Sequence, residues 1–278
     1  MALRWTALIL IAITTSLAGA YEPGQPESKS SEAMPTELNG VGVTEHLGAS
    51  IDLGLVFTDE ANQPVTLGKY FQSERPVAMA MVYYDCPHLC TYQLNGILDV
   101  VKQMKGEAGK DYEFVIVSMD HKETAELAAQ KKESYMKALG QPNAASAWHF
   151  LVGSEASVRT LADQLGFKFR WDERLKQFAH AAVMYVLTPS GKISRYLHGI
   201  EYSPQTFRFS LIEASGGKVG TMIERATLFC FQFDPTKNKY TLYAFNLVRI
   251  VAALVVALLA LFIVPAWFRE RKGRAPGA

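Results

Sequence analysis

The chain has almost no excess of charge of either sign. Its 278 residues carry 28 lysines and arginines against 27 aspartates and glutamates, which gives a formal net charge of +1. Chains that bind nucleic acid usually show a basic excess, so this balance gives no indication of a nucleic-acid partner. The sequence also lacks internal repeats and low-complexity blocks, which excludes a repeat array. Local motifs therefore carry the information about function in this sequence.

Cysteine is scarce, with three residues in the whole chain. Two of them form the motif Cys86-Pro-His-Leu-Cys90, directly after the apolar run 76–84. That run is short and almost without polar breaks, which is typical of a buried strand. Residues 91–106 carry apolar side chains at helical spacing and predict an amphipathic helix. The motif therefore lies at the junction between a predicted strand and a predicted helix.

The spacing of the two cysteines supports three kinds of chemistry. On a helix, positions four apart share one face, with Cα atoms roughly 6 Å apart. That separation allows a reversible disulfide between Cys86 and Cys90, whereas the reduced pair offers two thiolates to a soft metal ion. The third alternative is a structural disulfide or two buried thiols. At a helix N-terminus the pKa of the Cys86 thiol is lowered, while the neighbouring carboxylate of Asp85 opposes that shift.

The two ends of the chain predict export and membrane attachment. Residues 1–20 have the basic start, apolar stretch and small-residue cleavage site of a signal peptide, with an uncleaved anchor as the alternative. Residues 246–268 contain an apolar stretch about as long as a bilayer is thick, which predicts a transmembrane helix. The basic tail 269–278 then lies in the cytoplasm by the positive-inside rule. We therefore expect a single-pass protein of a bacterial inner membrane with its main domain in the periplasm.

Between these ends the chain divides into three parts. Residues 21–44 are rich in Pro, Ser and Glu and predict a flexible tether. Residues 45–215 suit one α/β domain. Residues 216–245 form a juxtamembrane segment that predicts a β-hairpin around an Asp-Pro turn. This segment holds Cys230, which we expect to be either a buried apolar thiol or a reactive thiol serving the other two.

The order of predicted elements indicates a fold. A hairpin at 53–67 comes first, and strands and helices then alternate up to a second hairpin and a closing helix, with Ser154 predicted to cap one of the helices. Such an order predicts a sheet covered by helices on both faces. It fits a thioredoxin-like fold with an N-terminal β-hairpin extension. The predicted elements are strands at 76–84, 112–119, 148–152, 183–188 and 193–198, and helices at 91–106, 122–139, 154–165 and 203–214.

From about Gly54 to Glu213 the chain resembles the Sco/SenC family of copper-handling thioredoxin-like proteins. Four segments carry this resemblance, and their combination is much more specific than a lone Cys-x-x-x-Cys. They are the opening hairpin at 57–67, the motif Asp85-Cys-Pro-His-Leu-Cys90, the strand ending Ile116-Val-Ser-Met-Asp120, and His180-Ala-Ala-Val-Met-Tyr-Val-Leu-Thr-Pro-Ser-Gly191.

The resemblance implies a site and a partner. It implies that Cys86, Cys90 and His180 bind one copper ion per domain, and that the protein helps to assemble the copper centre of a cytochrome c oxidase. The implied partners are the copper-bearing oxidase subunit or another copper client, a thiol reductant, and the membrane through the C-terminal helix. Two thiolates and an imidazole suit copper(I), although zinc is a natural competitor for such a set.

Three departures from the family pattern mark a divergent branch. Thr91 stands where the family usually has proline, His88 stands where it usually has an acidic residue, and His121-Lys-Glu-Thr follows Asp120 in place of Pro-Glu-Arg-Asp-Thr. None of these departures removes an implied ligand. Asp120 is either a strand-end cap or a partner of a metal-bound imidazole.

A second function remains open from the sequence. The chain is also compatible with a thiol–disulfide oxidoreductase that reduces client cysteines before metal insertion, with Cys86 as the nucleophile and Cys90 resolving the mixed disulfide. General thioredoxins carry Cys-x-x-Cys instead of this wider spacing, which favours the chaperone. His180 separates the two hypotheses, because a reductase does not need it and a copper site does.

Overall fold

A five-stranded sheet forms the centre of the protein in this computed structural model, which describes residues 40–86, 89–216, 220–229, 231–242 and 244–273. The strand order is β11-β10-β4-β5-β6. The pairs β4–β5 and β5–β6 are parallel, whereas β10 is antiparallel to both β4 and β11. The strands are β4 (Val77–Val82), β5 (Glu113–Ser118), β6 (Trp148–Leu151), β10 (Val183–Leu187) and β11 (Ile193–His198).

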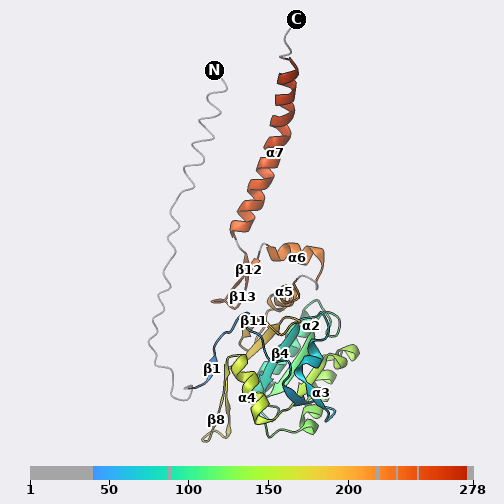
Figure 1. The fold of residues 1–278 in the computed structure, drawn as a ribbon, viewed down its shortest axis with the longest axis vertical. Coiled ribbons are helices and arrows are strands. Elements are labelled where there is room, and N and C mark those ends of the chain that lie inside the picture. The colour runs from blue at the N-terminus through green and yellow to red at the C-terminus, as the bar shows by residue number, and fades with distance from the viewer. Residues whose placement is uncertain (1–39, 87–88, 217–219, 230, 243, 274–278) are drawn as a thin grey trace. The chain divides into compact units, whose positions relative to one another are not determined.

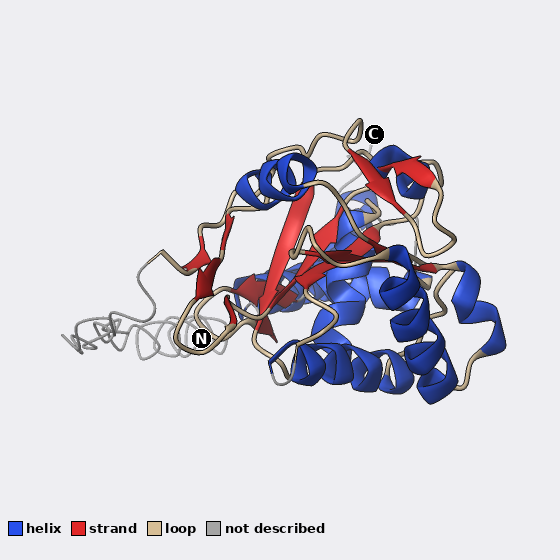
Figure 2. Cartoon of the chain, turned by 90° about the horizontal axis from the view of Figure 1, so that it is seen from below, coloured by secondary structure: helices blue, strands red, loops and turns tan. Residues whose placement is uncertain are grey.

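Helices lie on both sides of this sheet (Figures 1 and 2). The connections from β4 to β5 and from β5 to β6 step across the sheet in the same direction, so right-handed crossovers place α2 and α3 on one face. Helix α2 also contacts α5, and α5 packs on β10 and β11. Helix α4 lies on the other side and contacts β7. The bounds are α2 (Leu89–Gln103), α3 (Ala125–Leu139), α4 (Glu155–Gln164), α5 (Pro204–Ala214) and β7 (Phe167–Lys168).

The two parallel strands β4 and β5 lie at the centre of the hydrophobic core. Every residue of β4 and of β5 is buried, as expected for strands covered on both faces. Helix α2 approaches the chain after β11 so closely that a Cβ built on Gly96 would lie 1.7 Å from the carbonyl oxygen of Ile200. Only glycine fits at this crossing, because any side chain would overlap that backbone.

Several short strands and two 3₁₀ helices lie around the edge of the core. Strands β2 (Val56–Thr58) and β3 (Pro64–Thr66) form the N-terminal hairpin, and β1 (Gly42–Val43) pairs with β7. A further hairpin consists of β8 (Arg170–Asp172) and β9 (Gln177–Ala179). The 3₁₀ helices are η2 (Leu67–Phe71) and η3 (Pro142–Ser146).

The chain continues beyond the α/β core with four more elements. They are α6 (Met222–Phe229), the antiparallel strands β12 (Phe231–Asp234) and β13 (Lys239–Leu242), and α7 (Ala244–Gly273). In the part of the chain that the structure describes, no helix combines the length and the apolar character that crossing a membrane requires.

The predicted α/β, thioredoxin-like core with its N-terminal hairpin is confirmed. The predicted helix cap is also present, since the Ser154 hydroxyl accepts a hydrogen bond from Ser157 N–H. Several boundaries differ by up to three residues. The helix expected from residue 122 begins at Ala125, where Thr124 caps its first turn, and the helix expected at 91–106 extends from Leu89 to Gln103. Strands β8 and β9 and helix α6 were not predicted. The predicted signal peptide 1–20 and the tether up to residue 39 lie outside the described residues.

Candidate metal centre

Cys86 lies in the loop that follows β4, at the carboxyl edge of the sheet. Its side chain is 7% exposed and belongs to the main hydrophobic core. The backbone immediately before it is held by a carboxylate from a distant part of the chain. Glu123 accepts hydrogen bonds from the N–H of Tyr84 (2.8 Å) and from the N–H of Asp85 (2.7 Å). The cysteine therefore follows a fixed segment of backbone.

The carboxylate of Glu123 is itself held in place. It accepts a further hydrogen bond from the hydroxyl of Ser118, the last residue of β5. Burial raises the pKa of Glu123 above its ordinary value, and the hydrogen bonds from Ser118, Tyr84 and Asp85 oppose that rise. Through Glu123, the end of β5 and the turn before α3 are joined to the loop that carries Cys86.

Cys90 belongs to the first turn of α2, and its side chain lies outside what the structure describes, as do residues 87 and 88. The hydroxyl of Thr91 donates a 3.2 Å hydrogen bond to the carbonyl of Cys86. Cys86 itself precedes α2, so the helical spacing expected for the two cysteines does not describe this residue. Thr91, one of the three departures from the family pattern, thus links the helix to the loop through its hydroxyl, a group that proline lacks.

His180 lies between β9 and β10 and is 7% exposed. Its Nδ1 is 2.9 Å from the carbonyl oxygen of Ala181, and only a protonated Nδ1 can donate to that acceptor. With the proton on Nδ1, the lone pair of the imidazole lies on Nε2, which is the form that binds a metal. The rings of Tyr83 and Phe167 approach the imidazole edge-on, with centroids 6.3 and 6.1 Å away.

The strand register brings His180 to the same edge of the sheet as Cys86. Met184 of β10 pairs with Ala80 of β4, so the antiparallel strands run on to place His180 opposite the residues just after β4. The ring contact between His180 and Tyr83 agrees with this placement. Helix α2 reaches the same edge, because Gln93 donates a 2.8 Å hydrogen bond to the carbonyl of Val183.

The described residues do not complete a metal-binding set. Among them, no group of three or more histidine, cysteine or acidic side chains is close enough to hold a metal ion. The structure thus brings two of the three predicted ligand positions, Cys86 and His180, to one edge of the sheet. The contribution of Cys90 stays a prediction.

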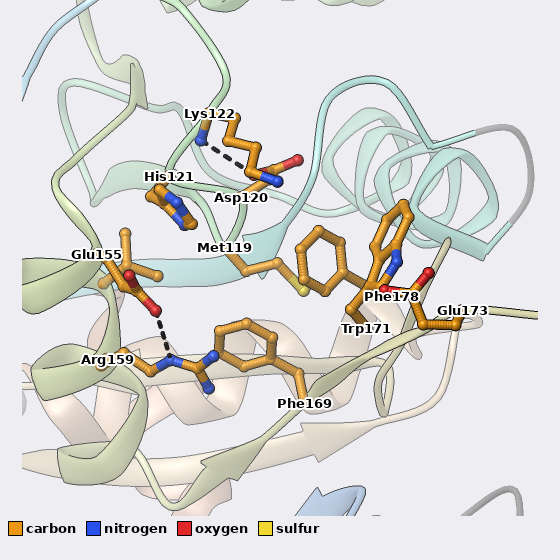
Figure 3. Close-up of a pocket in the computed structure, with 11 residues that line it drawn as sticks. Met119, Asp120, His121, Lys122, Glu155, Arg159, Phe169, Trp171, Glu173 and Phe178 are labelled. Carbon is orange, nitrogen blue, oxygen red and sulfur yellow. Dashed lines mark hydrogen bonds and ion pairs between the residues drawn. The ribbon is translucent and has the colours of Figure 1, made fainter. Parts of the chain in front are cut away.

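A pocket of about 330 Å³ opens beside this edge (Figure 3). Asp120 lines it, and its Oδ1 accepts a 3.0 Å hydrogen bond from the N–H of Lys122, so the carboxylate caps its own turn. Phe178 forms one wall and also contacts Tyr83, with ring centroids 5.3 Å apart. The pocket and the surroundings of His180 therefore share an aromatic wall. The residues lining the pocket are Met119, Asp120, His121, Lys122, Glu155, Val158, Arg159, Phe169, Trp171, Glu173 and Phe178.

Of two polar residues near the sheet, Glu123 was missed by sequence reasoning and His149 was predicted to have a structural role. Glu123 was not singled out as a site residue, because it lies inside the helix predicted at 122–139, whereas in the structure it precedes α3. His149, predicted to be structural, lies at the opposite edge of the sheet, with Nε2 3.3 Å from Glu113 and its ring against Tyr70. His149 is therefore remote from the candidate site.

Solved structures with a similar fold were compared with the chain. A putative electron transfer protein from Aquifex aeolicus shares 22% identity with a TM-score of 0.54, covering 62% of this chain and 96% of its own. ScoI from Arabidopsis thaliana with copper bound shares 18% identity with a TM-score of 0.44, covering 60% and 95%. BsSco, described as a member of the Sco family of cytochrome c oxidase assembly proteins, shares 17% identity with a TM-score of 0.49, covering 62% and 97%.

At 22% identity the Aquifex aeolicus structure supports the fold alone. A search of curated proteins found no match. The family comparison is more specific, because the SCO1/SenC family matches residues 48–214, which is more than half of the chain. The matched region begins before the N-terminal hairpin and ends with α5, so it includes both Cys86 and His180. The chain belongs to the SCO1/SenC family.

Proposed function

We propose that the protein is a copper chaperone that binds one copper ion through Cys86, Cys90 and His180. It passes this ion to the copper centre of a cytochrome c oxidase. Copper is its cargo, so ligand exchange with the client is the chemistry required, and no bond of the protein needs to be made or broken. Family membership supports this proposal, and so does the description of BsSco as belonging to oxidase assembly proteins.

The observation that carries the proposal is the shared position of Cys86 and His180. Both are buried at the carboxyl edge of the sheet, and the β4–β10 register places their segments side by side. A sulfur and an imidazole nitrogen with its lone pair on Nε2 form a soft donor set suited to copper(I). The aromatic neighbours of His180 exclude water from one side, which favours a low-coordinate soft ion over a hydrated one.

The test is an anaerobic copper(I) titration of the full chain in detergent against a competing chelator. His180→Ala is compared with wild type, and His149→Gln serves as the matched control because it changes a partly buried histidine at the far edge of the sheet. We expect one tightly bound ion in wild type and at least a tenfold loss in His180→Ala, which corresponds to about 1.4 kcal/mol. His149→Gln should bind as wild type does.

Two outcomes would contradict the copper function. Equal losses in both histidine variants would mean that His180 acts only through stability. Absence of tight binding in wild type would make the thiol–disulfide oxidoreductase the working function, provided that a thiol reductant reduces a Cys86–Cys90 disulfide to two thiols and an oxidised client disulfide forms it again. Zinc(II) titrated in parallel shows whether the site prefers the soft ion, since zinc competes for a Cys₂His set.

We also propose, from the sequence and although no described helix meets the requirements for crossing a membrane, that the domain faces the bacterial periplasm, held to the inner membrane by residues 246–268 with the tail 269–278 in the cytoplasm. Support comes from the apolar sequence of this segment and from the exposure of its large apolar side chains, including Val251, Leu258 and Phe262. Protease treatment of spheroplasts tests this orientation. The domain should be digested while the tail is protected, and protection of the domain would reverse the proposed topology.

A further inference from the structure

The segment after the family region packs onto the α/β core instead of leading away from it. The family match ends at residue 214, whereas the β12–β13 hairpin lies beyond it. Tyr240 of β13 is buried together with Phe209 and Ile212 of α5, and the rings of Phe209 and Tyr240 meet edge-on with centroids 5.5 Å apart. The hydroxyl of Tyr240 also donates to Glu213. The hairpin is therefore part of the folded domain.

The turn of this hairpin holds the end of a core strand. Asn238 accepts a hydrogen bond from the N–H of His198 on its Oδ1 (3.2 Å) and donates one from Nδ2 to the carbonyl of the same residue (2.7 Å). One side chain thus satisfies both backbone groups of His198, as a neighbouring strand would. Asn238 has a φ of +49°, a left-handed conformation that asparagine adopts more readily than most residues.

The strand end that Asn238 holds adjoins the loop that carries His180. His198 is the last residue of β11 and pairs with Val183, the first residue of β10. The next N–H, that of Gly199, donates a 2.9 Å hydrogen bond to the carbonyl of Ala182. Two side-chain hydrogen bonds to His198 and one backbone hydrogen bond from the adjacent Gly199 therefore connect Asn238 to Ala182, two positions from His180.

We propose that Asn238 is a positioning residue for His180, acting through the end of β11. The proposal rests on the copper function proposed above. The side chain of His198 does not carry the effect, because its Nε2 is engaged separately with Glu45 at 2.7 Å. Without the two hydrogen bonds between Asn238 and His198 (the Asn238 clasp), the ends of β11 and β10 separate more often. The imidazole of His180 is then held less well in the orientation that binds copper.

Variants of the hairpin turn test the proposal in the full chain. Asn238→Gly removes the clasp but suits the left-handed φ, so the turn itself is preserved. Asn238→Asp keeps the acceptor for His198 N–H and loses the donor, which makes it the conservative variant. Lys237→Ala changes an exposed side chain of the same turn that does not contact His198, and it is the matched control.

Copper(I) affinity is the first measurement, together with amide hydrogen exchange of the free protein. We expect Asn238→Gly to weaken copper(I) binding about tenfold, as outer-shell partners commonly do, with Asn238→Asp between it and wild type. The amides of His198 and Gly199 should exchange faster in Asn238→Gly, while those of β5 stay unchanged. Lys237→Ala should match wild type in both measurements.

A double-mutant cycle separates positioning from general stability. In the His180→Ala background, Asn238→Gly should cause no additional loss of affinity, because its effect passes through the missing imidazole. An equal loss in both backgrounds, or an unchanged affinity in Asn238→Gly, would overturn the proposal while leaving the copper function intact. Failure of wild type to bind copper(I) would instead overturn both.

Discussion

Two glutamates fasten segments of this protein by opposite means, one holding the loop beside the candidate site and the other joining helix α6 to helix α5. Glu123 accepts hydrogen bonds from two backbone N–H groups and a hydroxyl, and burial raises its pKa. Glu224 of α6 faces the guanidinium of Arg208, with bonds of 3.1 and 3.2 Å. The hydrogen bonds from Arg208 lower the pKa of Glu224 to about 2.

The difference between the two glutamates reflects which charged groups each region can accommodate. A guanidinium beside Cys86 would stabilise a thiolate permanently and compete with a cationic metal for it. The site edge is instead held by neutral donors, at the cost of a carboxylate that is ionised with more difficulty. The C-terminal segment binds no cation in the proposed function, so an ion pair can fasten it to the core.

The largest effect is expected from Glu123→Ala. This change leaves the N–H groups of Tyr84 and Asp85 without their acceptor, and hydrogen bonds to charged groups contribute about 1.5–3 kcal/mol each. We expect the free energy of unfolding to fall by about 3 kcal/mol, measured by urea denaturation with tryptophan fluorescence. Lys122→Ala, an exposed neighbour in the same turn, should change it little. A loss below about 1 kcal/mol would mean that Glu123 does not hold the loop.

A smaller effect is expected from Arg208→Ala at the other region. The Arg208 side chain is 11% exposed and joins Asp111 in the core to Glu224 in α6. Its removal leaves two carboxylates facing each other without a cation, for which we expect a loss of about 2 kcal/mol in the same urea experiment. Arg208→Lys should recover only part of this, because lysine lacks the planar fork. Full recovery would show that charge alone is required.

The pH dependence of stability should differ in sign between the two glutamates. The pKa of Glu123 is raised on folding, so its contribution is present in full below about 4.5 and is lost as the pH rises through the folded pKa. The pKa of Glu224 is lowered, so its contribution is present above about 4.5 and is lost as the pH falls towards 2.

Urea denaturation of Glu123→Gln and Glu224→Gln across this range measures both trends. Relative to its variant, wild type should become less stable with rising pH in the first comparison and less stable with falling pH in the second. Parallel curves in both comparisons would contradict the opposite pKa shifts. The neighbouring charges are the same within each comparison, so the difference isolates one carboxyl group.

The smallest effect is expected at a fully exposed ion pair. Glu173 and Lys176 lie 2.7 Å apart in the turn of the β8–β9 hairpin, with more than 70% of each side chain exposed. Glu173→Gln should change the free energy of unfolding by less than about 0.5 kcal/mol, since exposed pairs contribute little. A change comparable with that of Arg208→Ala would remove the contrast between buried and exposed pairs.

Much of the core could be predicted from the sequence because its signals are local. The apolar run of β4, the helical spacing in α2 and the cap at Ser154 each lie within a few residues of what they determine. The same holds for the position of Cys86 at the end of a strand. The Asp-Pro turn likewise indicated a hairpin, and β12 and β13 form one at this place.

Contacts between segments far apart in the sequence could not be predicted from those local signals. Glu123 bonds Tyr84 across 39 residues, and Asn238 bonds His198 across 40, so neither contact leaves a periodic pattern. Strands β8 and β9 have three residues each, too few for an alternation to be recognised. His180 was identified by family resemblance, because its neighbours along the chain are merely apolar or small.

The close contact between Gly96 and Ile200 restricts the movement of helix α2. Because the backbone of α2 lies directly on the carbonyl of Ile200, the helix cannot roll or slide past that point without a collision. Gly96 follows Cys90 by six residues and so acts as a fixed pivot within the helix. If the chain binds copper as proposed, we expect any accompanying movement of α2 to be confined to the part of the helix before Gly96.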